Sequence, residues 1–149
     1  MNTGVVTHPF MSDREAAAWE SCQLLRGGDD PWKAMCRAGA GIARQLACDL
    51  KLLRAPLDYA PLKALALLGR GHNAGDALLA LRALHISGVR MRVRVIFALG
   101  RDELRPLVRR ALEECAAAGL EMETFDWKDS PALFNRQVWD FSIDGIFGM

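Results

Sequence analysis

The segment Lys63–His85 constrains the fold most, because a strand pattern leads directly into a glycine-rich turn and then a helical pattern. Residues 63–68 are almost wholly apolar, which is typical of a strand buried on both faces of a parallel sheet. After the turn Gly69–Asp76, leucines and alanines recur at helical spacing. Strand, turn and helix form the front half of a βαβ unit, where doubly wound folds bind their ligands.

Strand and helix patterns alternate along the following chain. Further strands are predicted at Val89–Leu99, Leu120–Trp127 and Val138–Ile143. Between the first two, a helix is predicted that Asp102 caps and Gly119 ends. This alternation predicts a three-layer αβα, Rossmann-like α/β fold, with a doubly wound, mainly parallel sheet and helices on both faces.

The N-terminal segment is predicted to be helical. Ser12 and Glu15 have the spacing of a capping box for a helix that runs to about Leu25. Asp30 and Pro31 suit the N-cap and first position of a second helix, which ends near residue 53. The face of this second helix that is predicted to pack on the domain carries Trp32, Met35, Gly39, Ile42 and Leu46.

Length and charge limit the kind of protein. The 149 residues suffice for one domain, and because they stop directly after the fourth strand pattern, we expect residues 1–149 to be a single domain that is incomplete at its C-terminus. The net charge of +1 gives no electrostatic reason to expect nucleic acid or an anionic membrane as a partner. No apolar run has transmembrane length, and the N-terminus does not have the pattern of a signal peptide. The four cysteines form no C-x-x-C pair, which favours reduced thiols in a cytoplasmic protein.

The glycine turn fits a loose dinucleotide-binding pattern, Gly69-x-Gly71-x-x-Ala74. Such a site ordinarily also has a carboxylate at the end of the second strand, which binds a ribose. Here no acidic residue precedes Asp102 at that position. An ordinary NAD-linked dehydrogenase is therefore disfavoured.

Two aspartates are candidates for the chemistry. Asp76 lies at the start of the helix after the turn, and Asp144 directly follows the fourth strand. In a doubly wound sheet the first and fourth strands are neighbours, so both carboxylates and the Asn73 amide are predicted to converge on one oxygen-rich corner. Such a corner suits a hard cation or acid–base catalysis. The alternatives are that Asn73 or Asp76 caps its helix, that Asp144 caps a following helix, and that His72 only contacts a ligand or solvent.

Three motifs, in order and at suitable spacing, resemble the YjeF N-terminal domain, the fold of the NAD(P)HX epimerases. Residues 35–39 (MCRAG) match the family's M-E-x-A-G, and residues 69–77 (GRGHNAGDA) match its turn G-x-G-N-N-G-G-D-G. Residues 144–148 (DGIFG) match the start of D-x-x-F-G-T-G. The chain departs from these motifs at Cys36, His72, Ala74 and Met149.

The resemblance implies an isomerase of metabolite repair, an NAD(P)H-hydrate epimerase that interconverts the R and S forms of NADHX and NADPHX. These hydrates form when water adds to the nicotinamide ring, and a partner or fused dehydratase domain then dehydrates the S form. A homodimer is also expected. The resemblance further implies a potassium ion held by Asn73 and Asp144, and a role for Asp76 and Asp144 in polar or acid–base catalysis. The substrate-binding residues that it implies are His72, Asn73, Ala74, Gly75, Asp76 and Gly148.

A second interpretation remains open. The bulkier residues His72 and Ala74 in the turn favour a non-catalytic module of the same fold that dimerises or binds a partner. The retained Asn73, Asp76 and Asp144 favour the enzyme.

Overall fold

A computed structural model of the chain describes residues 30–53, 60–129 and 137–147, together with residues 12, 14, 15, 18 and 22. The helices are α2 (Pro31–Leu53), α3 (His72–Ile86), α4 (Pro106–Ala117) and the short 3₁₀ helix η1 (Trp127–Asp129). The strands are β1 (Leu62–Leu68), β2 (Met91–Phe97), β3 (Met122–Asp126) and β4 (Phe141–Gly145). Among the described helices none is long and apolar enough to cross a membrane.

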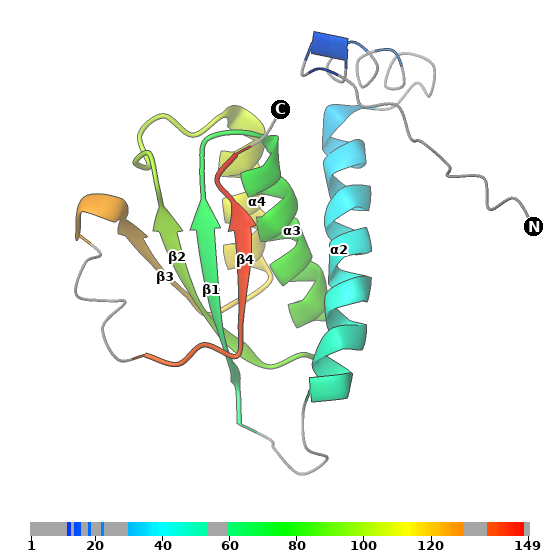
Figure 1. Cartoon of the computed structure of the whole chain (residues 1–149), viewed down its shortest axis with the longest axis vertical. Coiled ribbons are helices and arrows are strands. Elements are labelled where there is room, and N and C mark those ends of the chain that lie inside the picture. Colours follow the sequence, from blue (N-terminus) through cyan, green and yellow to red (C-terminus); the bar gives the residue numbers. More distant parts are fainter. Residues whose placement is uncertain are drawn as a thin grey trace, which may run out of the picture.

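The four strands form one parallel sheet in the order β3-β2-β1-β4. β1 lies between β2 and β4, so the first and fourth strands are neighbours, as the sequence predicts. The carboxyl ends of the strands and the N-terminal ends of α2 and α3 lie at the same end of the molecule (Figure 1). The α/β class and the parallel sheet are thus confirmed.

The described α-helices all lie on the same side of the sheet. Both crossovers, β1–α3–β2 and β2–α4–β3, step in the same direction across the sheet, so right-handed connections put α3 and α4 on the same face. α2 packs on α3, outside the sheet (Figure 1). Buried side chains from α2, α3 and α4 form one core with Leu68 and Phe97 of the strands. The second helical layer that the sequence predicts is not among the described elements.

Two element starts differ from the sequence predictions. α4 begins at Pro106 with Arg105 as N-cap, and Asp102 lies in the preceding turn, so the predicted Asp102 cap is wrong. Proline suits the first helical position, and it forces the preceding residue into the extended conformation that Arg105 has. β4 begins at Phe141 rather than Val138, because Asp140 ends the crossover: its Oδ2 accepts a hydrogen bond from the Lys63 N–H at 2.6 Å.

The N-terminal predictions are confirmed where the structure describes them. Ser12 and Glu15 exchange the hydrogen bonds of a capping box, and Asp30 Oδ1 accepts from the Trp32 N–H at 3.1 Å. The predicted apolar face of α2 is wrong at Ile42, which is 40% exposed, because the buried stripe runs through Ala43 instead.

Residues 137–140, which lead into β4, are held by Arg94 against the face of the sheet away from α3. Its guanidinium donates to Glu123 Oε2 at 2.8 Å and to Gln137 Oε1 at 2.8 Å. It also lies over the rings of Phe125 and Trp139. These contacts fix the path of the chain into β4, whose far end forms part of the candidate site.

Candidate functional site

The glycine turn after β1 and the end of β4 are in direct contact. The Gly69 N–H donates to the Gly145 carbonyl oxygen at 3.0 Å, and Asn73 Nδ2 donates to the Phe147 carbonyl oxygen. These segments are about seventy positions apart in the chain, and β1–β4 pairing brings Leu68 opposite Gly145. The sequence prediction that both segments meet at the carboxyl end of the sheet agrees with this geometry.

Glycine is required on both sides of this contact. A Cβ on Gly69 would collide with the carbonyl group of Ile146, and a Cβ on Gly145 would lie 2.7 Å from the Asn73 carbonyl oxygen. Both neighbours are backbone atoms, which cannot swing aside. The two glycines therefore let the turn and the strand end approach closely.

Gly71 differs from these two glycines. It is the N-cap of α3 with φ −88°, and none of the described atoms lies within 4 Å of the position of a Cβ. Since Gly71 holds the N-cap position, neither Asn73 nor Asp76 does, and the capping alternative for those two residues is wrong. The open space above Gly71 lies at the positive end of α3, where a ligand can approach the backbone.

Two of the predicted substrate-binding residues are buried. Ala74 is 0% exposed and belongs to the hydrophobic core. Gly75 is buried as well, and a Cβ there would collide with the Met35 side chain of α2. The methyl group that distinguishes Ala74 from the family's glycine thus lies in the core and does not narrow the open side of the turn.

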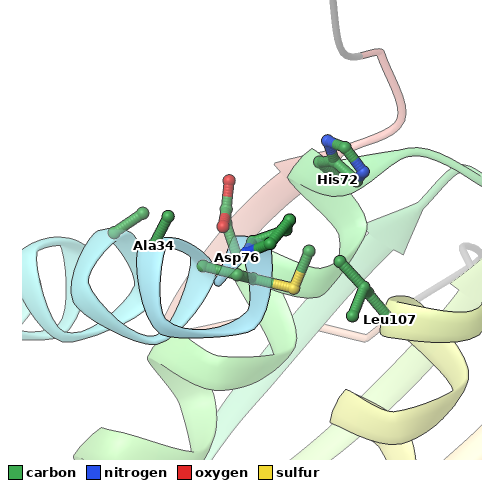
Figure 2. A pocket seen from close by; sticks show the side chains of 7 residues that line it. Ala34, His72, Asp76 and Leu107 are labelled. Atoms are coloured by element: carbon green, nitrogen blue, oxygen red, sulfur yellow. The ribbon is translucent and has the colours of Figure 1, made fainter. Parts of the chain in front are cut away.

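Asp76 lines a cavity of about 240 Å³ between α2, α3 and the start of α4. His72 stands at the rim, the Asp76 carboxylate points alongside α2, and Leu107 closes the side formed by α4 (Figure 2). Apolar side chains also line the cavity, among them Met35 of α2. A cavity lined by a carboxylate, an imidazole and apolar side chains suits a small ring that carries a hydroxyl group.

Asp144 lies in different surroundings. It pairs with Leu67, whereas the neighbouring Gly145 faces Asn73 and the start of α3. Because successive side chains of a strand point to opposite faces, the Asp144 side chain leaves β4 on the face of the sheet away from α3. It is exposed, and its Oδ1 accepts from the Ile146 N–H at 2.8 Å.

The predicted corner is therefore assembled in part. Asn73 and the end of β4 come together, but the cavity beside Asp76 is lined by neither Asn73 nor Asp144. Convergence of the two carboxylates on one volume is not what the structure shows. Gly148 lies outside the described residues.

Asn73 and Asp144 offer oxygen atoms, which are the ligands that hard cations prefer. Asn73 uses its amide nitrogen to donate to Phe147, which leaves the amide oxygen to act as a ligand, and Asp144 contributes a carboxylate. Among the described residues no group of three His, Cys, Asp or Glu side chains could hold a metal. The donor chemistry of Asn73 and Asp144 thus fits potassium in kind.

Sequence reasoning missed the residues that α2 and α4 contribute to the cavity. Pro31, Ala34 and Leu107 line it beside Asp76. Only the match at Met35–Gly39 pointed to α2, and nothing near Leu107 in the sequence marks it, since its place depends on how α4 packs on α3.

Comparisons with known proteins show the family of this chain. The family model described as "YjeF-related protein N-terminus" matches residues 33–149. The chain belongs to this family. The match spans α2, the glycine turn and the end of β4, so the resemblance drawn from the three motifs is confirmed.

Two curated relatives show what this chain is similar to. An NAD(P)H-hydrate epimerase of Bordetella pertussis is 36% identical over 110 residues, which cover 74% of this chain and 41% of that protein. A bifunctional NAD(P)H-hydrate repair enzyme, Nnr, of Thermofilum pendens is 30% identical over 115 residues, which cover 76% of this chain and 20% of that protein. The chain thus spans less than half the length of either relative.

A solved structure supports the fold. The crystal structure of yeast ynu0 (YNL200c) superimposes with a TM-score of 0.70 at 19% identity, over 89% of this chain and 54% of that one. The α/β fold of the YjeF type is thereby confirmed.

Proposed function

We propose that this chain contributes to an NAD(P)H-hydrate epimerase, an isomerase that interconverts the R and S forms of NADHX and NADPHX. One observation carries the proposal: the family's glycine turn contacts the end of β4, where the family's aspartate is retained as Asp144. The relatives named as epimerases support the activity. The buried position of Ala74 supports it too, because this departure from the family leaves the open side of the turn unchanged.

The two parts of the site have separate tasks in this proposal. The cavity beside Asp76 and His72 takes the hydrated nicotinamide ring, whose saturated carbon atoms contact Met35. The Asp76 carboxylate holds the ring hydroxyl and can exchange a proton with it. Residues His72–Asp76 bind the rest of the substrate along the backbone at the start of α3, and Gly148 remains a proposed substrate-binding residue.

Asn73 and Asp144 hold a potassium ion in this proposal. When bound, the ion adds positive charge at the turn, which helps to fix the anionic substrate. Asn73 also ties the turn to β4 through Phe147, so it orders the ion site and the substrate segment together.

We further propose a cytoplasmic location, which the four free cysteines support. A dehydratase partner or fused domain would consume the S form, and the bifunctional relative supports such a pairing. A homodimer remains part of the proposal, as an expectation for the family.

The test is an epimerase assay with the full-length protein. R and S NADHX are mixed with an S-specific dehydratase, and the recovery of NADH is followed by absorbance. The proposal predicts complete recovery when the protein is added. Persistence of the R form at the uncatalysed rate would show instead that the chain is a non-catalytic binding module.

A further inference from the structure

A second cavity opens at the carboxyl end of the sheet, between β3 and α4. It has a volume of about 590 Å³ and lies two strands away from the β1–β4 contact. Asp126, the last residue of β3, lines it together with Leu112 and Arg109 of α4 and Arg101 of the loop after β2. It shares no lining residue with the cavity beside Asp76.

Asp126 carries an unsatisfied acceptor in this cavity. Its Oδ1 is buried and has no hydrogen-bond partner within the described part of the chain. Native proteins pair almost all buried polar atoms, so an unpaired carboxylate oxygen at the wall of a cavity indicates that a ligand or water supplies the donor.

The strand register places Asp126 next to the position at which dinucleotide-binding sheets carry their acidic residue. Asp126 pairs with Phe97, the last residue of β2. Dinucleotide-binding sheets use a carboxylate at the end of the second strand to accept hydrogen bonds from a ribose. β2 of this chain ends without a carboxylate, but the adjacent strand β3 carries Asp126 at the same register position.

The loop beside Asp126 is fixed in place. Arg101 donates from Nη1 to Thr124 Oγ1 at 3.0 Å, and its guanidinium lies over the Phe97 ring. Thr124 and Asp126 are two residues apart on β3, so both face α4. This preformed wall fits a rigid polar ligand such as a sugar.

We infer that this cavity binds the adenosine ribose of the dinucleotide substrate, with the Asp126 carboxylate accepting hydrogen bonds from the 2′- and 3′-hydroxyls. The inference rests on the proposed function. The two strand spacings between β1 and β3, about 10 Å, leave room for the pyrophosphate over the start of α3, between the nicotinamide end and this ribose. A 2′-phosphate would replace one hydroxyl donor and bring negative charge to a lining in which three carboxylates (Asp102, Glu113 and Asp126) outnumber the guanidinium groups of Arg101 and Arg109, so the subsite favours NADHX over NADPHX.

The test measures binding of ADP-ribose and of its 2′-phosphate by calorimetry in the full-length protein, which needs no catalysis. The native protein is expected to bind ADP-ribose more tightly than the 2′-phosphate. Asp126→Asn should weaken ADP-ribose binding by about tenfold, the effect of losing a hydrogen bond to a charged acceptor, and narrow the gap between the two ligands. The control Asp129→Asn changes an exposed carboxylate outside the cavity and should leave both dissociation constants unchanged.

Asp126→Ser serves as a second variant, and circular dichroism checks the folding of each. Unchanged binding in folded Asp126 variants, no binding of ADP-ribose by the native protein, or equal binding of the 2′-phosphate would each overturn the ribose subsite. The epimerase assay separates this inference from the proposed function. Epimerase activity that is insensitive to Asp126→Asn overturns the subsite alone, whereas ADP-ribose binding through Asp126 without epimerase activity overturns the epimerase alone.

Discussion

At the scale of single residues, the candidate site depends on a few polar groups whose surroundings differ. Asp76 lines a cavity, whereas Asp144 is exposed at a strand end. The sequence identified both residues, because each stands in a recognisable motif. The sequence did not predict that the two carboxylates are separated, because the face of the sheet to which the Asp144 side chain points depends on the register of β4 against β1.

The variant Asp144→Asn tests the proposed ion site. Replacing the carboxylate with an amide removes its charge, so the epimerase rate should fall by about tenfold or more, and any dependence on potassium should weaken. Epimerase assays over a range of potassium concentrations measure both effects. The matched control is Glu121→Gln. Glu121 is an exposed carboxylate that precedes β3 at the other end of the sheet. An Asp144→Asn enzyme with native rate and native potassium response would remove Asp144 from the site.

A buried thiol gives a prediction about pH. Burial raises the pKa of the Cys115 thiol to about 12, well above its ordinary value, and its S–H donates to the Leu78 carbonyl oxygen at 3.2 Å. A raised pKa means that the folded state holds this proton while the unfolded state loses it. The contribution to stability is therefore complete below about pH 9, and it is lost as the pH rises toward 12.

Urea unfolding between pH 8 and pH 11 measures this effect. The free energy of unfolding should fall above about pH 9 with a slope that approaches about 1.4 kcal/mol per pH unit for the single proton. Cys115→Ala isolates the contribution, because other groups also titrate in this range. Equal slopes for the native protein and Cys115→Ala would contradict the assignment.

At the scale of secondary-structure elements, the sequence was most informative where local chemistry decides the structure. The apolar run of β1, the glycine turn and the helical spacing of α3 were found within a residue or so. Two starts were missed. β4 begins late because of the tertiary contact between Asp140 and Lys63. α4 begins at Pro106 because of a local signal, the proline that follows Arg105, which the sequence analysis did not use.

Two glycines of α2 make a matched pair. A Cβ on Gly39 would lie 2.7 Å from Leu79 Cβ and 3.0 Å from the α3 backbone, whereas one on Gly41 would meet only Arg44 Nη2 at 3.9 Å. Gly39→Ala should therefore destabilise the fold by about 1–3 kcal/mol through overpacking. Gly41→Ala should stabilise it by up to about 1 kcal/mol, because alanine favours the helix. Urea unfolding of both variants checks this, and equal effects would mean that α2 does not pack on α3 as described.

At the scale of the whole molecule, the parallel sheet brings the ends of β1, β2, β3 and β4 to one edge. Topological rules made the β1–β4 contact predictable, because first and fourth strands are neighbours in doubly wound sheets. The two cavities at this edge were not predictable. Each lies between a helix and its neighbours, and its lining depends on packing that no local motif encodes.

Hydrogen–deuterium exchange of the full-length protein, with and without R-NADHX, tests most directly that the substrate binds where the glycine turn meets β4. The account predicts that the substrate slows exchange at residues 69–76 and 145–147 together, while exchange at residues 137–140, on the face of the sheet away from α3, is unchanged. Slower exchange in only one of the segments 69–76 and 145–147, or only at residues 137–140, would contradict this prediction.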